Sequence, residues 1–254
     1  MIEAVFFDID GTLLSFHTHQ VSVGTIRAAA RLRSHGIRLF LSTGRPQVLI
    51  PHMPIDFDGL VTMNGALVKV ADQNVYTNPI PDTDCRAWVD FAQQNNLCTM
   101  IFTADGMLAA QLNEAGKMLR DQLDFPMPPV VDIEQFRGLE IYQIIALMPQ
   151  QFDATVAKVL PHCRLPRWHN AFTDIVANGN NKAHGMDALC QHLGINRSRT
   201  VAFGDGANDI EMLEWAGIGV AMGNADPIVK QHADMITTDV DHEGIETAIN
   251  KLLT

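Results

Sequence analysis

The chain has 254 residues, of which 47% are hydrophobic, and this length fits one large α/β domain or two smaller ones. Its formal net charge of −11 argues against nucleic-acid binding, which depends on basic residues for phosphate contacts. The N-terminus lacks the basic start and apolar stretch of a signal peptide, and no apolar run approaches the roughly 20 residues of a membrane helix. We therefore expect a cytoplasmic protein without membrane segments. No Cys-x-x-Cys pair occurs among its four cysteines, and we expect all four to be reduced thiols.

The first part of the chain alternates apolar runs with segments of helical spacing. Residues 4–7 form an unbroken apolar run, which is typical of a strand buried on both faces of a parallel sheet. In the helix that follows, Ser22 is expected as the N-cap and Gly36 as the C-cap. The pattern predicts strands over 4–7, 37–41 and 59–63, a helix over 22–35, and a second helix that begins at Pro46. Such alternation indicates a doubly wound sheet.

The alternation breaks after residue 63. Residues 67–70 and 74–77 are expected to form a hairpin, and the turn-rich segment 78–82 follows it. The pattern then predicts helices near 83–95, 113–124 and 150–160 and strands near 97–103, 139–147 and 163–168. We therefore expect a small α+β domain over 81–171, inserted into the sheet domain.

The alternation of the first part returns at Phe172. The pattern predicts strands over 172–177, 200–203 and 218–221 and helices after Lys182, from Asp209 and over 242–253. The predicted fold is a doubly wound, Rossmann-like parallel sheet core over 1–80 and 172–254, interrupted by the α+β insert.

Polar residues follow the predicted strands of the core, where open α/β sheets bind their ligands. Asp8 and Asp10 come after the first strand, and two carboxylates at this spacing can share one crevice. One could attack phosphorus while the other transfers protons. Thr43 and Gly44 come after the second strand, where a hydroxyl and an unhindered N–H form a phosphate cradle. Taken singly, each pair is also compatible with an ordinary turn.

Two further groups lie in the C-terminal part. Lys182 begins a helix, where a cation is unfavourable for the helix dipole, so a bound phosphate or the Asp8 carboxylate would explain it. A surface lysine is the alternative. After the strand 200–203, Asp205 and Asp209 offer carboxylate oxygens and Asn208 an amide, and oxygen ligands suit Mg²⁺. A calcium loop would require a different spacing of acids, ending in a glutamate.

Together and in this order, these residues resemble the haloacid dehalogenase superfamily, and within it the Cof-like phosphatases with a type IIB cap domain. The resemblance covers the whole chain. It rests on FFDIDGTLL around Asp8, LSTGR around Thr43, Lys182 itself, and GDGANDIEML around Asp205. The segments MNGA at 63–66 and GVAMGNA at 219–225 are also similar to this branch.

The resemblance implies a Mg²⁺-dependent phosphatase and a role for each residue. Asp8 would be the nucleophile that forms an aspartyl-phosphate, and Asp10 would protonate the leaving alcohol and then activate water. Mg²⁺ would bind the Asp8 carboxylate, the Asp10 main-chain carbonyl and Asp205, with Asp209 further from the ion. The phosphoryl oxygens would be held by Thr43, Gly44, Lys182 and Asn208.

The insert, as the cap, is expected to contact the leaving group. Candidate residues are Arg167, Trp168 and His169 near its end and Asp174 just beyond it, although Trp168 also fits the core of the insert and Arg167 its surface. We expect a small phosphorylated substrate, foremost a hexose or pentose phosphate. The alternatives are a cofactor phosphate of the flavin or pyridoxal type, a sugar phosphomutase, and a non-catalytic phosphosugar sensor. The oligomeric state stays open, and a monomer is compatible with the sequence.

Overall fold

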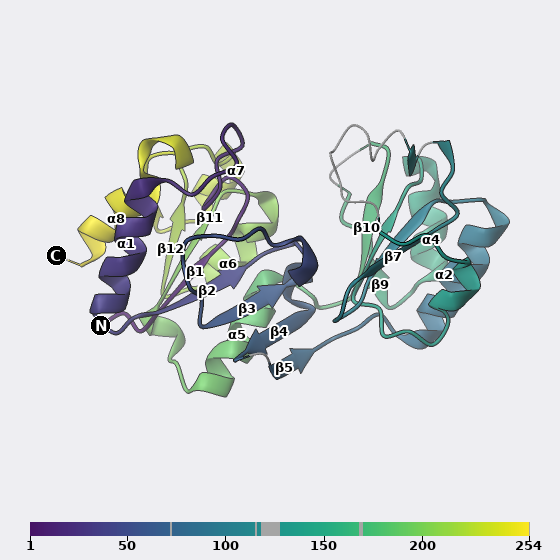
Figure 1. Cartoon of the computed structure of the whole chain (residues 1–254), viewed down its shortest axis with the longest axis horizontal. Coiled ribbons are helices and arrows are strands. Elements are labelled where there is room, and N and C mark those ends of the chain that lie inside the picture. The colour runs from purple at the N-terminus through teal and green to yellow at the C-terminus, as the bar shows by residue number, and fades with distance from the viewer. Residues whose placement is uncertain (72, 115, 118–127, 168–169, 254) are drawn as a thin grey trace. The chain divides into compact units, whose positions relative to one another are not determined.

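The chain consists of two compact units. The computed structural model describes all residues except 72, 115, 118–127, 168–169 and 254. Residues 1–45, 49–77 and 181–254 form the larger unit, and residues 46–48 and 78–180 form the smaller one (Figure 1).

An eight-stranded sheet forms the larger unit, in the order β13-β12-β11-β1-β2-β3-β4-β5. Its strands are β1 (Ala4–Phe7), β2 (Arg38–Ser42), β3 (Gly59–Thr62), β4 (Leu67–Val70), β5 (Gln73–Thr77), β11 (Thr200–Gly204), β12 (Ile218–Ala221) and β13 (Met235–Ile236). The strands from β13 to β3 are parallel, and β4 and β5 are antiparallel. Because β1 pairs with β2 on one side and with β11 on the other, the chain changes direction across the sheet there. The carboxyl end of β1 is therefore the switch point at which such sheets bind ligands.

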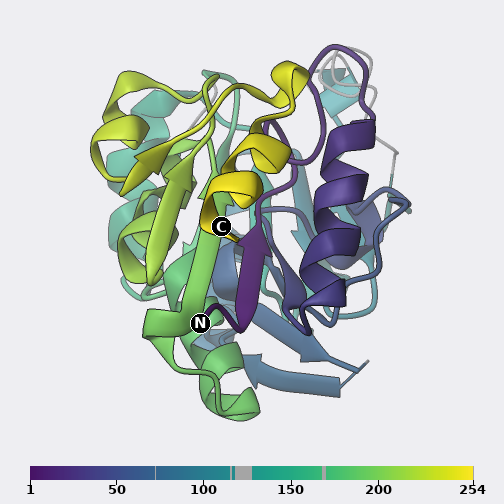
Figure 2. The same cartoon turned by 90° about the vertical axis from the view of Figure 1, so that its left-hand side faces the viewer.

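Helices cover both faces of this sheet. Helices α1 (Val23–Ser34) and α8 (Gly244–Leu252) lie side by side on the face lined by Val5 and Phe7 (Figure 2). Helices α5 (Lys182–Leu193) and α6 (Ile210–Trp215) cover the face lined by Ala4 and Phe6, and α7 spans Pro227–Gln231. Successive residues of β1 thus enter opposite cores, which explains why this strand is apolar throughout.

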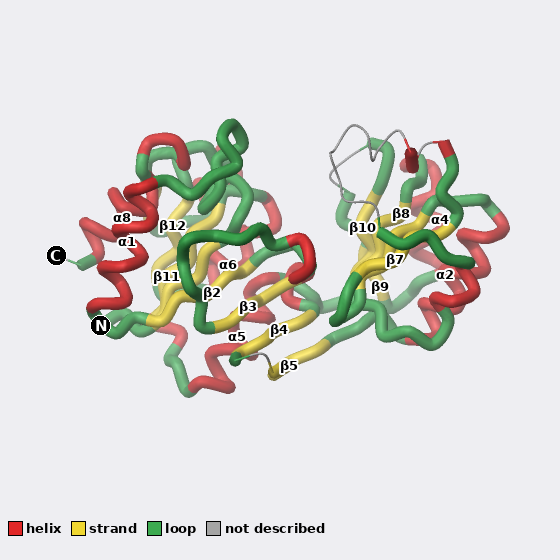
Figure 3. Tube along the Cα trace, in the orientation of Figure 1, coloured by secondary structure: helices red, strands yellow, loops and turns green. Residues whose placement is uncertain are grey.

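The smaller unit is an antiparallel sheet with helices on one face. Its strands are β6 (Thr99–Phe102), β7 (Met107–Ala110), β8 (Gln143–Ala146), β9 (Cys163–Arg164) and β10 (Thr173–Ala177), in the order β7-β6-β8-β10-β9. Helices α2 (Asp82–Gln94) and α4 (Asp153–Val159) pack Trp88 and Val156 onto the face that presents Ile101 and Ile144 (Figure 3). Because only alternate residues of each strand enter this core, its strands are less uniformly apolar than β1.

Two predictions of the sequence are wrong. The helix expected from Pro46 is only a 3₁₀ turn over Gln47–Leu49, because Pro51 and Pro54 follow and a helix cannot continue through them. The strand expected over 172–177 exists, but it pairs with β8 and β9 in the smaller sheet, so the smaller unit extends to residue 180. An apolar strand has the same pattern in either sheet, which is why the sequence misplaced it.

Most other predicted elements are present within a few residues of their expected ends. The helix expected over 113–124 falls largely outside the described residues. Strands β7 and β13 and helix α7 were not predicted. Within the described ranges, no helix has both the length and the apolar character needed to cross a membrane.

Candidate active site

Asp8 and Lys182 form a buried ion pair at the carboxyl end of β1. Nζ of Lys182 lies 2.5 Å from Oδ1 of Asp8 and 2.5 Å from Oδ1 of Asp209. Lys182 is the first residue of α5, whose N-cap Asn181 accepts a hydrogen bond from the backbone of His184. Burial opposes the charge of Lys182, but Asp209 and Asp8 outweigh it and raise its pKa above the ordinary value. The two carboxylates explain why a cation begins this helix.

Three carboxylates gather around this lysine. Oxygens of Asp8, Asp205 and Asp209 all lie within 4.8 Å of one another. Burial raises the pKa of Asp8, with Lys182 opposing and Asp209 adding to the rise, and burial together with Asp209 raises the pKa of Asp205 to about 7. One lysine cannot neutralise three carboxylates, and oxygen donors are the ligands that a hard divalent cation prefers. The donor set therefore fits Mg²⁺.

Among the described residues, Asp209 accepts the most hydrogen bonds of the three carboxylates. Its Oδ1 accepts from Lys182, and its Oδ2 accepts from the backbone N–H groups of Asp205 and Gly206 at 2.9 and 2.8 Å. Asp209 thus shapes the loop after β11 and holds Lys182. Asp8 and Asp205 accept fewer hydrogen bonds from the described residues, so they are better placed than Asp209 to bind a cation directly.

Two residues that the sequence did not assign orient Asp205. Oγ1 of Thr12 donates to its Oδ1 at 3.0 Å, and Nδ2 of Asn224 donates to its Oδ2 at 3.0 Å. Nδ2 of Asn224 also donates to the carbonyl of Gly11 at 2.8 Å. Gly11 has a φ of +79°, and a Cβ at this position would lie 2.1 Å from Oδ2 of Asp205. Only glycine therefore lets the chain turn so close to the acidic cluster.

Arg45 holds Asp10, a contact that the sequence did not predict. Nε and Nη2 of Arg45 donate to Oδ2 and Oδ1 of Asp10, both at 2.7 Å, and Nη1 donates to the carbonyl of Leu49 at 2.8 Å. A bidentate pair fixes both the position and the plane of a carboxylate. Arg45 belongs to the LSTGR motif, but it lies 35 residues from Asp10 in the sequence, so the sequence did not predict that the two residues pair.

The residues expected to hold phosphate converge beside the pair formed by Arg45 and Asp10. Thr43 is buried, and its Oγ1 accepts from the backbone of Arg45 at 3.0 Å. A Cβ on Gly44 would lie 3.3 Å from the side-chain amide of Asn64 and 3.5 Å from Nδ2 of Asn208. The loops after β2, β3 and β11 thus bring Gly44, Asn64 and Asn208 together.

The residues expected to contact the leaving group belong to the smaller unit. Arg167 pairs with Asp153 at 2.8 and 2.6 Å and also donates to the carbonyl of Phe172 at 2.9 Å, so its guanidinium already serves the fold of this unit. Asp174 lies on β10 and is buried. Trp168 and His169 lie outside the described residues.

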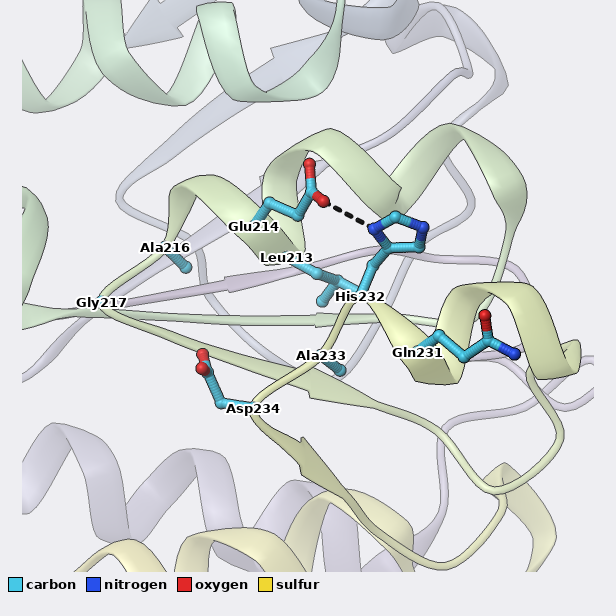
Figure 4. A pocket seen from close by; sticks show the side chains of 8 residues that line it. All are labelled: Leu213, Glu214, Ala216, Gly217, Gln231, His232, Ala233 and Asp234. Atoms are coloured by element: carbon cyan, nitrogen blue, oxygen red, sulfur yellow. Dashed lines mark hydrogen bonds and ion pairs between the residues drawn. The ribbon is translucent and has the colours of Figure 1, made fainter.

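A separate cleft of about 410 Å³ occurs elsewhere in the larger unit (Figure 4). Two of its lining residues, Gly217 and Asp234, directly precede β12 and β13, so the cleft lies at the amino ends of these parallel strands. Nδ1 of His232 and Oε1 of Glu214 are 2.5 Å apart in it. Because Asp8 lies at a carboxyl end, this cleft is not part of the candidate active site.

The family model of the haloacid dehalogenase-like hydrolases matches residues 5–249. The chain belongs to this family. YkrA of Bacillus subtilis strain 168, whose name includes the word phosphatase, is 31% identical over 98% of this chain and 96% of its own length. The pyridoxal phosphate phosphatase YbhA of Escherichia coli strain K12 is 28% identical over 92% of this chain and 93% of its own length.

A solved structure of a subclass IIB sugar phosphatase from the same superfamily agrees in fold. It has a TM-score of 0.87 and 35% sequence identity, and the match covers 98% of each chain. This haloacid dehalogenase-like hydrolase is thus a phosphatase of the Cof-like group, as its motifs predicted.

Proposed function

We propose that this phosphatase hydrolyses sugar phosphates in a Mg²⁺-dependent reaction, with Asp8 as the nucleophile that becomes an aspartyl-phosphate. The observation that carries this proposal is the position of Asp8 at the switch point of the sheet. There its carboxylate contacts Lys182 and lies within 4.8 Å of carboxylate oxygens of Asp205 and Asp209.

Binding must first overcome repulsion between Asp8 and the phosphate. Two unit charges about 4 Å apart repel by roughly 4 kcal/mol at an effective dielectric of 20. Lys182 offsets part of this, and a Mg²⁺ held by Asp8, Asp205 and the Asp10 carbonyl would supply the remaining positive charge. The phosphoryl oxygens are held by Thr43, the Gly44 N–H, Lys182 and Asn208.

Asp10 moves the protons in both halves of the reaction. As a carboxylate oxygen of Asp8 bonds to phosphorus, the bond to the sugar oxygen breaks, and Asp10 gives its proton to that oxygen. Asp10 then accepts a proton from the water that attacks phosphorus and releases Asp8. Arg45 keeps the Asp10 carboxylate in one orientation.

We assign recognition of the sugar to the smaller unit, with Asp174, Trp168 and His169 as candidates. Arg167 is left out because its guanidinium is engaged within that unit. A sugar substrate is supported by the subclass IIB sugar phosphatase, which is 35% identical, against 28% for the pyridoxal phosphate phosphatase. Pyridoxal phosphate is the second candidate, because a relative that acts on it aligns over most of the chain.

Phosphate release from a panel of hexose phosphates, pentose phosphates, pyridoxal phosphate and a flavin mononucleotide tests this proposal. We expect the sugar phosphates to have the highest kcat/KM, EDTA to stop release, and Mg²⁺ to restore it. Asp8→Asn should release no phosphate while its circular dichroism matches that of the parent. An Asp8→Asn variant as active as the parent would refute the assignment of Asp8 as the nucleophile. A higher kcat/KM for pyridoxal phosphate than for the sugar phosphates would refute the proposed sugar substrate. Rapid isomerisation of a sugar 1-phosphate would indicate a mutase.

A further inference from the structure

The turn after β3 has an unusual backbone. Met63, Asn64 and Gly65 have φ values of +50°, +53° and +88°, so three successive residues are left-handed. Glycine adopts this conformation freely and asparagine tolerates it, but for methionine it is unfavourable. Such strain persists only where the surrounding structure enforces it, and it is concentrated at functional sites.

Two neighbouring elements enforce this turn. The backbone N–H groups of Met63 and Asn64 donate to the carbonyls of Arg45 and Thr43, both at 3.1 Å. On its other side the turn packs against the start of α5, since a Cβ on Gly65 would lie 2.1 Å from the Asn181 carbonyl. The turn is therefore fixed between the loop that carries Thr43 and Gly44 and the helix that begins with Lys182.

This backbone directs the amide of Asn64 over Gly44. Both its Oδ1 and its Nδ2 lie 3.3 Å from the point where a Gly44 Cβ would stand. Its Oδ1 accepts a hydrogen bond from Nδ2 of Asn208 at 3.1 Å. Its Nδ2 donates to no atom of the described residues, although Asn64 has only 9% of its surface exposed. A residue that is about nine-tenths buried thus places an amide donor without a partner among the described residues beside Gly44.

We propose that Asn64 binds a phosphoryl oxygen through Nδ2 and, through Oδ1, orients Asn208 for the same task. This inference rests on the proposed function, because it adds a donor to that phosphate site. The side chain must accept from Asn208 and donate to an anion at once, which an amide does and a carboxylate cannot. It must also sit on a left-handed backbone, which favours asparagine over glutamine.

The variants Asn64→Gly and Asn64→Asp test this role, because both residues tolerate a φ of +53°. We expect Asn64→Gly to raise KM and the inhibition constant of inorganic phosphate by about tenfold to a hundredfold, the effect of one lost hydrogen bond to a charged group. Asn64→Asp should raise both further, since its carboxylate repels phosphate. If Asn64→Gly does not fold, the nearly isosteric Asn64→Asp decides the test alone.

Asn96 provides the matched control. It is also left-handed, with a φ of +49°, but it is exposed in the smaller unit in the turn after α2. Asn96→Gly and Asn96→Asp should leave KM and phosphate inhibition unchanged. Inhibition by phosphate in both Asn64 variants equal to that of the parent would overturn this inference and leave the phosphatase intact. Failure of the parent itself to release phosphate would instead refute the proposed function.

Discussion

Arg45 binds both oxygens of Asp10, so the proposed proton donor is oriented by a single guanidinium. Arg45→Ala should lower kcat/KM for a sugar phosphate by about a hundredfold, the lower range for general acid catalysis. For p-nitrophenyl phosphate the loss should be small, because p-nitrophenolate leaves without a proton. Steady-state kinetics with the two esters measures the difference.

Arg27 offers a control of the same geometry. It pairs with Glu246 through Nε and Nη2 at 2.9 and 2.8 Å, on the exposed surface between α1 and α8. Arg27→Ala should leave both kcat/KM values unchanged, because exposed ion pairs contribute little. An equal loss for both esters in Arg45→Ala would show that Arg45 does not act through the protonation of the leaving group.

Helix α5 links the proposed phosphate site to the sheet, because it begins with Lys182 and its Gly185 touches β3. A Cβ on Gly185 would lie 2.4 Å from Cγ1 of Val61 and 2.9 Å from Cα of Gly65. Gly185→Ala should therefore displace α5, lower the free energy of unfolding by about 1–3 kcal/mol, and reduce kcat/KM by about tenfold or more. Urea denaturation and kinetics measure the two effects.

Gly194 separates packing from backbone effects at the other end of the same helix. It is the C-cap, with a φ of +66°, and open space surrounds the position of its Cβ. Gly194→Ala should lower the free energy of unfolding by about 1 kcal/mol through backbone strain, with no change in kcat/KM. Full activity of Gly185→Ala would mean that the packing of α5 does not position Lys182.

The elements that follow simple periodic patterns could be predicted, and so could the residues at their ends. Asp8, Thr43 and Asp205 each follow a strand of the larger sheet, and Lys182 begins a helix that the sequence also placed. The contacts made by Arg45, Asn64 and Asn224 could not be predicted, because each joins segments that are distant in sequence. The orientation of an amide or a guanidinium depends on tertiary packing, which no local pattern contains.

At the level of the whole molecule, the acidic cluster should make the stability of the protein depend on pH and on bound metal. In metal-free protein, burial raises the pKa of Asp205 from 3.8 to about 7. The folded state therefore binds this proton more tightly than the unfolded state. The resulting stabilisation is complete below the unfolded pKa of 3.8 and is lost as the pH rises through 7.

Mg²⁺ should reverse this trend, because it binds the ionised carboxylates in competition with protons. The rise in Tm on adding Mg²⁺ should therefore be larger near pH 8 than near pH 5.5, as measured by thermal denaturation against EDTA-treated protein. In the Asp205→Asn variant, the rise in Tm on adding Mg²⁺ should be much smaller at both pH values. An equal rise in Asp205→Asn and the parent would exclude Asp205 as a ligand.

The division of the chain into two units could be predicted only in part from the sequence pattern. The doubly wound core was predicted because its strands are buried on both faces. The end of the insert was misplaced, because β10 resembles a core strand and only its pairing with β8 and β9 assigns it to the smaller sheet. Strand pairing joins distant segments, so a single sequence does not determine it.

The central claim is that Asp8 attacks phosphorus. Its most direct test is rapid acid quenching of the parent protein during the first turnover of a ³²P-labelled hexose phosphate, followed by proteolysis and mass spectrometry. The label should appear on the peptide that contains Asp8 and should be released by hydroxylamine, as an acyl phosphate is. Turnover with the label on another residue, or with no labelled protein at any quench time, would contradict the account.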